Sequence, residues 1–166
     1  MVTIEILEPA HFEMVARWLS NREVNRWLTS EWRDRVVDST MIGIAARNRK
    51  NRLFLVRCDG TPCGLTALAD FDSVDRIAMI WYVLGEEEVA GRGVTTSAVR
   101  QVVDRGFREL QLKSIYAWIM EDNLRSRRVL EKVGFREAGC IRLGTCSAGR
   151  QVARVYFDIV RPDENA

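Results

Sequence analysis

A glycine loop in the second half of the chain has the residue types that bind phosphate groups. Gly91 and Gly93 flank Arg92, and Thr95 and Thr96 follow where a long helix is predicted to begin. Glycine lets the backbone approach a ligand closely. The first turn of a helix leaves N–H groups unpaired at the positive end of its dipole. The loop is therefore a candidate phosphate or pyrophosphate site, with Arg92 adding charge and the threonines adding hydroxyl donors.

The loop by itself is weak evidence, because glycine is also the usual residue in tight turns. No Gly-Lys-Ser/Thr sequence follows, so the loop is not a Walker A loop. Thr96 stands where a dinucleotide-binding motif would have its third glycine. A simple strand-to-helix turn explains these residues about as well as a ligand site does.

A second polar segment follows a predicted strand and begins a short helix. Asn123 and Ser126 lie three residues apart, and Leu130 lies four further on, so the three share one helix face. Asn123 can offer both a donor and an acceptor to a ligand that contains amide groups. The alternative is that Asp122 or Asn123 only caps the helix.

Hydrophobic periodicity places these segments in an alternating series of strands and helices. The predicted strands are Val2–Leu7, Leu53–Cys58, Gly64–Phe71, Ile77–Leu84, Ser114–Met120, Phe135–Leu143 and Val152–Val160. The predicted helices lie within Ala10–Leu28 (broken at Ser20-Asn21), over Thr40–Ala46, after Gly93, and over Leu124–Val133. Hairpin turns are expected at residues 59–60 and 148–149. The pattern predicts an α/β (α+β) fold with a mixed, mostly antiparallel central sheet and helices on both faces.

Length and composition narrow the possible functions. The chain has 166 residues, which is the size of one domain, so residues 1–166 are expected to form a single domain. A net charge of +2 is too small to indicate a nucleic-acid partner. No apolar run is long enough to span a membrane, and the N-terminus does not resemble a secretory signal. We expect a cytoplasmic protein.

The cysteines do not indicate a metal site. Cys58 and Cys63 are separated by four residues, and Cys140 and Cys146 by five. The chain has one histidine, His11. Zinc sites favour closer cysteine pairs or a second histidine. We expect free thiols and no metal.

Taken together, the two polar segments resemble the GNAT superfamily of acyl-CoA-dependent N-acyltransferases. The stretch Gly91–Thr96 is similar to the pyrophosphate loop of that family, and Asn123–Phe135, with its Asn-x-x-Ser and Glu-Lys-x-Gly-Phe patterns, is similar to the pantetheine segment. The order of elements matches over Val2–Val160. Within the superfamily the chain looks most similar to the branch that contains ribosomal-protein N-terminal and spermidine acetyltransferases.

The resemblance implies an N-acetyltransferase that moves an acetyl group from acetyl-CoA (coenzyme A) to a primary amine of a small molecule or a protein N-terminus. It implies that the backbone amides of Gly91, Arg92, Gly93, Val94, Thr95 and Thr96 hold the pyrophosphate. The strand residues Tyr82, Val83 and Leu84, opened by a bulge, would pair with pantetheine and supply an oxyanion donor. Asn123 would bind the pantetheine arm, and Ser126 would lie near the sulfur.

Two positions depart from the family pattern at the reacting centre. Met79 stands where many relatives have a glutamate base, and Leu130 where many have a tyrosine acid. Ser126 then becomes the candidate proton donor, and Asp70 or Asp72 a substitute base or a site for the acceptor's cation. The alternative for both aspartates is turn chemistry. We favour catalysis by positioning of a neutral amine and an oxyanion amide, with Ser126 assisting.

Other functions remain open at this level. Met79 and Leu130 motivate a coenzyme A-binding module without catalytic activity, and an unrelated nucleotide-binding domain is a third alternative. Trp27 and Trp32 lie in the helical region that lines the acceptor pocket in the family. The edge of the last hairpin offers a surface for a homodimer.

Overall fold

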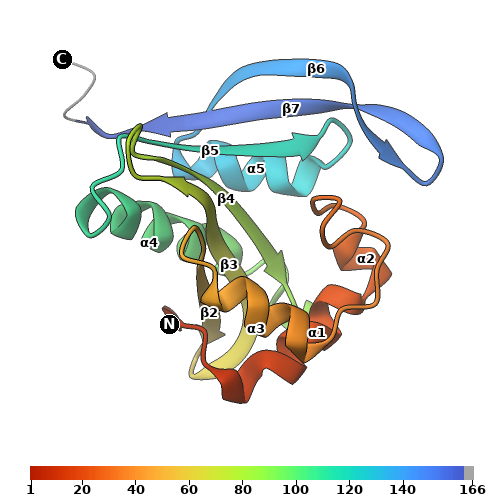
Figure 1. Ribbon diagram of the computed structural model, residues 1–166, viewed down its shortest axis with the longest axis vertical. Helices are drawn as coiled ribbons and strands as arrows, with labels where there is room; N and C mark the ends of the chain where they lie inside the picture. Colours follow the sequence, from red (N-terminus) through yellow and green to blue (C-terminus); the bar gives the residue numbers. More distant parts are fainter. Residues whose placement is uncertain (163–166) are drawn as a thin grey trace.

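A mixed seven-stranded sheet forms the centre of the computed structural model, which describes residues 1–162 (Figure 1). The strands are β1 (Val2–Ile6), β2 (Arg52–Cys58), β3 (Thr61–Asp72), β4 (Ile77–Leu84), β5 (Ser114–Met120), β6 (Arg136–Ser147) and β7 (Arg150–Val160). The helices are α1 (Phe12–Ser20), α2 (Arg22–Asn25), α3 (Ser39–Arg47), α4 (Val94–Arg108) and α5 (Leu124–Val133). Two 3-10 turns, η1 (Pro9–His11) and η2 (Glu87–Val89), complete the described elements.

The strands lie in the order β1-β2-β3-β4-β5-β7-β6, and every neighbouring pair is antiparallel except β4 and β5. Hairpin turns join β2 to β3 and β6 to β7, as the glycines at their turns predict. The parallel pair needs a crossover, and α4 supplies it. The predicted fold class is therefore confirmed, and the sheet is mostly antiparallel because one crossover interrupts two runs of hairpins.

Helices cover the sheet on both faces (Figure 1). On one face α4 and α5 pack on alternate strand residues, among them Ala78, Ile80 and Ile115, which belong to one buried cluster. On the other face α1 and α3 pack on a second cluster that includes Leu65, with Trp81 against it. Burial of each large aliphatic side chain stabilises the fold by about 1.5–3 kcal/mol. The alternation along β4 therefore fixes which of its side chains meet which layer of helices.

Local sequence signals set the ends of the helices. Asn21 breaks the first helical run, because its side chain accepts a hydrogen bond from the Glu23 N–H and caps α2. Asp38 caps α3 in the same way through the Met41 N–H, at 2.8 Å. Gly134 ends α5 with φ of 112°, a conformation that glycine adopts easily.

The feature that shapes the site is the separation of β4 from β5. Their parallel pairing covers only three residue pairs, from Ile77 with Ser114 to Met79 with Tyr116. Beyond Met79, β4 stays paired with β3, while β5 stays paired with β7. The two halves of the sheet diverge there. The inner edge of β4 from residue 80 onward therefore has no strand beside it, and its polar backbone groups are available to a ligand.

Two expectations about the strands need correction. We expected a bulge to open the strand at Tyr82–Leu84, but this part of β4 pairs regularly with β3, from Gly64 with Leu84 to Ala69 with Met79. The opening comes instead from the divergence of β4 and β5. The strands of the last hairpin are also longer than predicted, and β6 forms an edge of the sheet. Pairing of that edge between two subunits stays a prediction.

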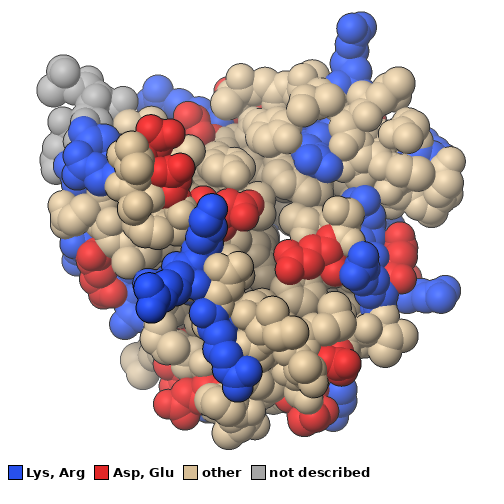
Figure 2. Space-filling view, in the orientation of Figure 1, with Lys and Arg blue, Asp and Glu red and all other residues tan. Residues whose placement is uncertain are grey.

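Charged side chains of both signs are mixed over the face drawn in Figure 2. In the described part of the chain, no helix is long and apolar enough to cross a lipid bilayer.

Candidate active site

The head of α4 presents a row of backbone donors. Gly91 and Gly93 have φ of 77° and 75°, which few residues other than glycine adopt without strain. The first backbone bond of the helix runs from the Ser97 N–H to the Gly93 carbonyl, at 3.0 Å. The N–H groups of residues 93–96 have no acceptor among residues 1–162. Four free donors at the positive end of a 15-residue helix fit a pyrophosphate well.

Arg92 lies beside this row but already has an acidic neighbour. Its Nη2 lies 3.0 Å from Oδ2 of Asp59, and Asp59 also binds the N-terminal ammonium of Met1. The bond from that ammonium is the main reason why the pKa of Asp59 is lowered. Because the pair is exposed, it is weak and can rearrange around a ligand. Arg92 thus lies near the expected phosphate site, but its guanidinium is paired with Asp59.

Three consecutive glutamates, Glu86, Glu87 and Glu88, precede the glycine loop, and they differ in their surroundings. Glu86 accepts a hydrogen bond from the indole Nε1 of Trp18 at 2.8 Å and is partly buried. Glu87 and Glu88 are exposed. The hydrogen bond to Trp18 fixes the orientation of the Glu86 carboxylate, and solvent screens the charges of Glu87 and Glu88. Both effects weaken the repulsion between these glutamates and a bound phosphate.

The strand residues predicted to bind the cofactor lie next to the head of α4. A small cavity is lined by Tyr82, Val83 and Leu84 of β4, by Val94 and Thr95 of α4, and by Gly64 and Thr66 of β3. This cavity brings together two segments that the sequence places about ten residues apart. The backbone edge of β4 thus continues from the row of donors at α4 toward the point where β4 and β5 separate.

The first turn of α5 is held by two hydrogen bonds, one from β4 and one from its own N-cap. The hydroxyl of Tyr82 donates to the backbone carbonyl of Ser126 at 3.2 Å, and Oδ1 of Asn123 accepts from the Ser126 N–H at 3.2 Å. Burial raises the pKa of Tyr82 far above its ordinary value of 10.0, so this hydroxyl stays a neutral donor. The arrangement holds Ser126 at the inner side of the opening.

Asn123 therefore acts as a helix cap, which the sequence left as the alternative to a ligand contact. Only its Oδ1 is used in this way, and its Nδ2 has no partner in the described chain. The Oγ of Ser126 likewise has no hydrogen-bond partner among residues 1–162, and the residue is half-buried. Both groups are free to contact a bound molecule.

The usual acid–base positions are apolar in the structure as well. Met79 is 8% exposed and Leu130 is fully buried in the cluster under α4 and α5. Neither side chain can exchange a proton. Any acid or base must therefore come from another element.

The two candidate aspartates have different surroundings. Oδ1 of Asp72 accepts from the N–H groups of Val74 and Asp75 at 2.8 and 2.9 Å, which lowers its pKa below 3.8. Asp72 is thus part of a turn. Asp70 makes no such bond, is exposed, and directly follows Ala69, which pairs with Met79. Of the two, only Asp70 has a free carboxylate.

Tyr116 on β5 is a nearby side chain that sequence reasoning missed. It pairs with Met79 where the two strands begin to separate. Burial, followed by the negative charge of Asp70, raises the pKa of Tyr116 above 10.0. Ile115, Ala117 and Ile119 pack under α4 and α5, so Tyr116 and Trp118 point to the opposite face. This placement needs the strand register, which a single sequence does not give.

The two tryptophans of the expected acceptor region, Trp27 and Trp32, have different surroundings. Trp32 is 4% exposed, and its ring centroid lies 6.0 Å from that of Trp81 on β4. Trp27 lies under the guanidinium of Arg26, at 4.4 Å. Trp32 therefore packs against β4, whereas Trp27 stacks with a neighbouring arginine.

Comparison with known proteins assigns this arrangement to a family. The family profile described as "Acetyltransferase (GNAT) domain" matches residues 2–136. The putative ribosomal N-acetyltransferase YdaF of Bacillus subtilis (strain 168) is 28% identical over 170 residues, which cover 96% of this chain and 91% of the relative. Spermidine N(1)-acetyltransferase of Escherichia coli (strain K12) is 27% identical over 139 residues, covering 83% of this chain and 74% of the relative.

Solved structures agree. A probable acetyltransferase superposes with a TM-score of 0.84 at 28% identity, over 98% of this chain and 94% of the other. Spermidine N-acetyltransferase from Vibrio cholerae, in complex with CoA and spermine, superposes with a TM-score of 0.86 at 19% identity, over 99% and 98% of the two chains. At that identity the second likeness concerns the fold alone. Because the curated relatives are named as acetyltransferases, the alternative of a non-catalytic binding module has no support from them.

Proposed function

Because the chain belongs to the GNAT acetyltransferase family and is an acyl-CoA-dependent N-acetyltransferase, we propose that its acceptor is a primary amine that reaches the thioester between β4 and β5. The acceptor is the amine of a small molecule or a protein N-terminus. The single observation that carries this proposal is the divergence of β4 from β5 after Met79, beside the free N–H groups at the head of α4.

The residues present fit acetyl-CoA, which supplies the activated acetyl group as a thioester. The N–H groups of residues 93–96 would bind the pyrophosphate. The open edge of β4 at Tyr82–Leu84 would pair with the amides of the pantetheine arm, as a missing strand would. Nδ2 of Asn123 would add a donor from the other side of the opening. No cluster of residues suited to a metal ion occurs in the described chain.

Three groups of the chain would then act on the reaction. A free backbone N–H of β4 would donate to the thioester carbonyl oxygen as charge develops on it. The Oγ of Ser126 would give its proton to the departing sulfur, directly or through water. The carboxylate of Asp70 would attract the acceptor's ammonium and take a proton from it, so that a neutral amine attacks. Met79 and Leu130 leave these roles to residues on other elements.

The acceptor must come from the face of Tyr116 and Trp118. Tyr82 and Ser126 lie on the face of α4 and α5, which the cofactor arm would occupy. The opposite face, toward α1 and α2, is then the remaining side for the attacking amine. The names of the relatives support an amine acceptor, since one is a putative ribosomal and the other a spermidine N-acetyltransferase. They differ in the kind of amine.

The test is acetyl-CoA consumption with a panel of small amines, amino acids, polyamines and N-terminal peptides. Loss of the thioester should be followed by its own absorbance, because Cys140 and Cys146 are exposed and would react with a thiol dye. We expect turnover with one class of amine and very little without acceptor. Tight acetyl-CoA binding with no turnover on any class would contradict the proposed acceptor and restore the non-catalytic alternative.

A further inference from the structure

We propose that the acceptor face of β5 and β7 contains an oxyanion-binding subsite centred on Arg154, so that the amine acceptor also carries a carboxylate or phosphate. This inference rests on the proposed function, because it identifies the class of acceptor at the same site. It concerns a residue of β7, beyond the residues 2–136 that the family profile matches.

Arg154 lies on the same face of the sheet as Trp118, next to the opening. In the sheet Arg154 pairs with Met120, and Tyr156 pairs with Trp118. Arg154 and Trp118 therefore share the face that Tyr116 occupies. The guanidinium carbon of Arg154 lies 4.0 Å from the centroid of the Trp118 ring. Trp118 is two residues, about 7 Å, beyond the last pair between β5 and β4. The cation thus lies beside the opening, within reach of a small acceptor.

The guanidinium of Arg154 has N–H donors that the described chain does not use. Nε and Nη2 of Arg154 donate to Oγ1 of Thr145 at 3.2 and 2.9 Å, and Nη1 lies 3.5 Å from the hydroxyl of Tyr156. A guanidinium has five N–H groups. These bonds use three of them and leave one on each terminal nitrogen. N–H groups on the two terminal nitrogens of a guanidinium can bind the two oxygens of a carboxylate or phosphate.

Arg154 also differs in charge pairing from other arginines of the described chain. Arg57, Arg105 and Arg127 each pair with a glutamate within 4 Å. Arg154 has no carboxylate partner in the described part of the chain, although it is partly buried. Its contacts are two neutral hydroxyls and an aromatic ring. A cation held in such surroundings lacks the counter-charge that usually accompanies burial, and an anionic ligand would supply it.

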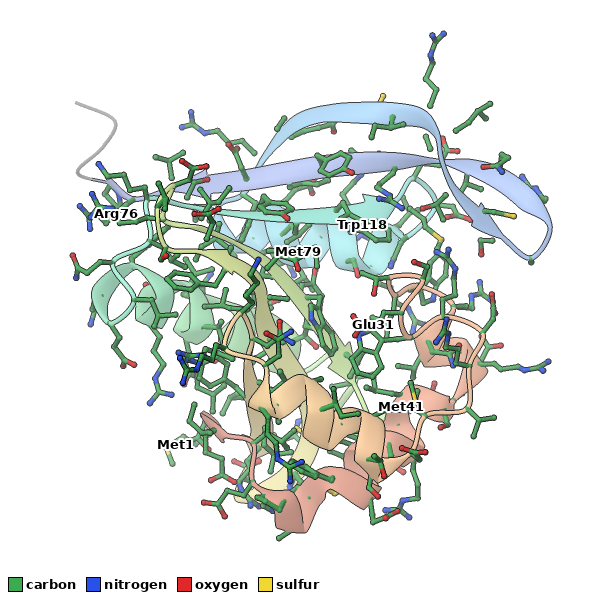
Figure 3. All side chains as sticks on the ribbon, viewed as in Figure 1. Met1, Glu31, Met41, Arg76, Met79 and Trp118 are labelled. Carbon is green, nitrogen blue, oxygen red and sulfur yellow. The ribbon has the colours of Figure 1, made fainter. Side chains whose placement is uncertain are left out.

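The surrounding space is suited to a small molecule. Figure 3 shows a space with Trp118 of β5 on one side and Glu31, from the loop after α2, on the opposite side. Met79 of β4 lies at the edge of this space. Figure 2 shows that the face toward the viewer is hollowed near its centre. An acceptor with an oxyanion at Arg154 would direct its amine toward the opening. A polyamine has only positive charge to offer there and would be repelled by the guanidinium.

The experiment compares matched acceptors that differ only in the oxyanion. The pairs are phenylalanine against phenethylamine, ε-aminocaproate against n-hexylamine, and O-phosphoethanolamine against ethanolamine, with spermidine as the polycation. In the wild type we expect kcat/KM to be at least about tenfold higher for the charged member of one or more pairs, as expected for a charge-assisted hydrogen bond. The carboxylate and phosphate pairs distinguish the two kinds of oxyanion.

Variants at Arg154 test whether this residue is responsible. Arg154→Gln should remove the preference by raising KM for the charged acceptor, while kcat/KM for the uncharged partner stays within about twofold. Arg154→Lys keeps the charge but not the fork, and should restore part of the preference. Arg105→Gln is the matched control, since Arg105 also lies over an aromatic ring, that of Phe54, but pairs with Glu109. It should leave the preference unchanged.

A binding measurement separates this inference from the proposed function. Phenylpropionate, which has the oxyanion but no amine, should bind the wild type in the presence of coenzyme A and bind Arg154→Gln at least about tenfold more weakly. Weak binding to Arg154→Gln would support the subsite even if no amine in the panel were acetylated. Equal kcat/KM for charged and uncharged acceptors, a preference for spermidine, or equal binding of phenylpropionate to both proteins would overturn it.

Discussion

At the scale of single residues, the site is distinguished by polar groups that have no partner. Oγ of Ser126 and Nδ2 of Asn123 make no hydrogen bonds inside the described chain. The backbone of Ser126, in contrast, is held at both its N–H and its carbonyl. A side chain that is free on a backbone that is fixed is suited to act on a ligand, because its position is set before the ligand arrives.

Replacement of Ser126 by alanine tests the role of its hydroxyl. We expect kcat to fall by about a hundredfold, the low end for loss of a general acid, since a thiolate leaves more easily than most groups. The dissociation constant of acetyl-CoA should not change, because the backbone contacts remain. Steady-state kinetics and calorimetric titration measure the two. A kcat within a factor of about two of the wild type would exclude proton donation by Ser126.

The two aspartates before β4 give a paired test of the base. Asp70→Asn should lower kcat/KM by about tenfold or more, because the free carboxylate is lost. Asparagine tolerates the φ of 53° at this position, so the fold should be kept. Asp72→Asn is the matched control and should affect stability alone. Equal loss of activity in both variants would show that the turn, and not a base, is what matters.

The pKa of Asp72 sets the pH range in which this control is informative. Hydrogen bonds from the Val74 and Asp75 N–H groups lower that pKa in the folded state. The stabilisation is therefore present above the ordinary carboxyl pKa of 3.8 and is lost as the pH falls through the folded value. Unfolding of Asp72→Asn and wild type should be compared at neutral pH, where the difference is fully present.

At the scale of elements, the heads of α4 and α5 offer different kinds of groups to the proposed cofactor. The head of α4 offers backbone N–H groups, and its glycines shape the loop. The head of α5 offers side chains, and Asn123 must also cap the helix. One element is therefore sensitive to backbone strain, and the other is sensitive to the loss of a single side-chain group.

Gly93→Ala should weaken acetyl-CoA binding through the backbone. A Cβ at this position would meet nothing within 4 Å, so the substitution causes no collision. It would disfavour the φ of 75° by about 1–2 kcal/mol and shift the N–H groups of the loop. We expect the dissociation constant to rise about tenfold. Gly149→Ala, with φ of 74° and equally open surroundings, should cost similar stability but leave binding unchanged.

Variants of Asn123 separate its two roles. Asn123→Asp and Asn123→Ser keep a capping oxygen, so the free energy of unfolding should change by less than about 0.5 kcal/mol, whereas Asn123→Ala should lose about 1 kcal/mol. If Nδ2 binds the pantetheine arm, all three should bind acetyl-CoA several-fold more weakly. Binding that falls only in Asn123→Ala would show that the residue serves the helix and not the ligand.

At the scale of the whole molecule, the two halves of the sheet are joined at only three residue pairs between β4 and β5. The packing of α4 and α5 on both halves supplies the rest of the connection. A ligand in the opening would contact the head of α4, the edge of β4 and the head of α5 at once. Its binding should therefore stabilise the relative position of the two halves of the sheet, as well as each segment that it contacts.

Hydrogen exchange provides a test at this scale. With acetyl-CoA at a hundred times its dissociation constant, the free energy of unfolding should rise by about 2.7 kcal/mol. Amide exchange should slow most at residues 80–84, 91–97 and 123–126, which border the opening. Protection confined to another part of the sheet would place the cofactor elsewhere.

Helices and strands could be predicted from the sequence, because the signals that define them are local. Ile77–Leu84, Ser114–Met120 and Leu124–Val133 were predicted with the bounds that the structure shows, from apolar period, β-branched content and the stop at Gly134. The glycine loop and the Asn-x-x-Ser pattern predict a cofactor site from the sequence alone, since each depends on residues that are near each other in the chain. The family resemblance was confirmed by the profile that matches residues 2–136.

Contacts between neighbouring strands could not be predicted from the sequence, because they depend on the pairing of distant segments. The opening arises from the divergence of two strands whose partners, β3 and β7, are far apart in sequence, and no local bulge announces it. The contact of Arg154 with Trp118 depends in the same way on register and on the pairing of β5 with β7. The face on which a strand residue lies follows from its pairing, and pairing is a property of the whole fold.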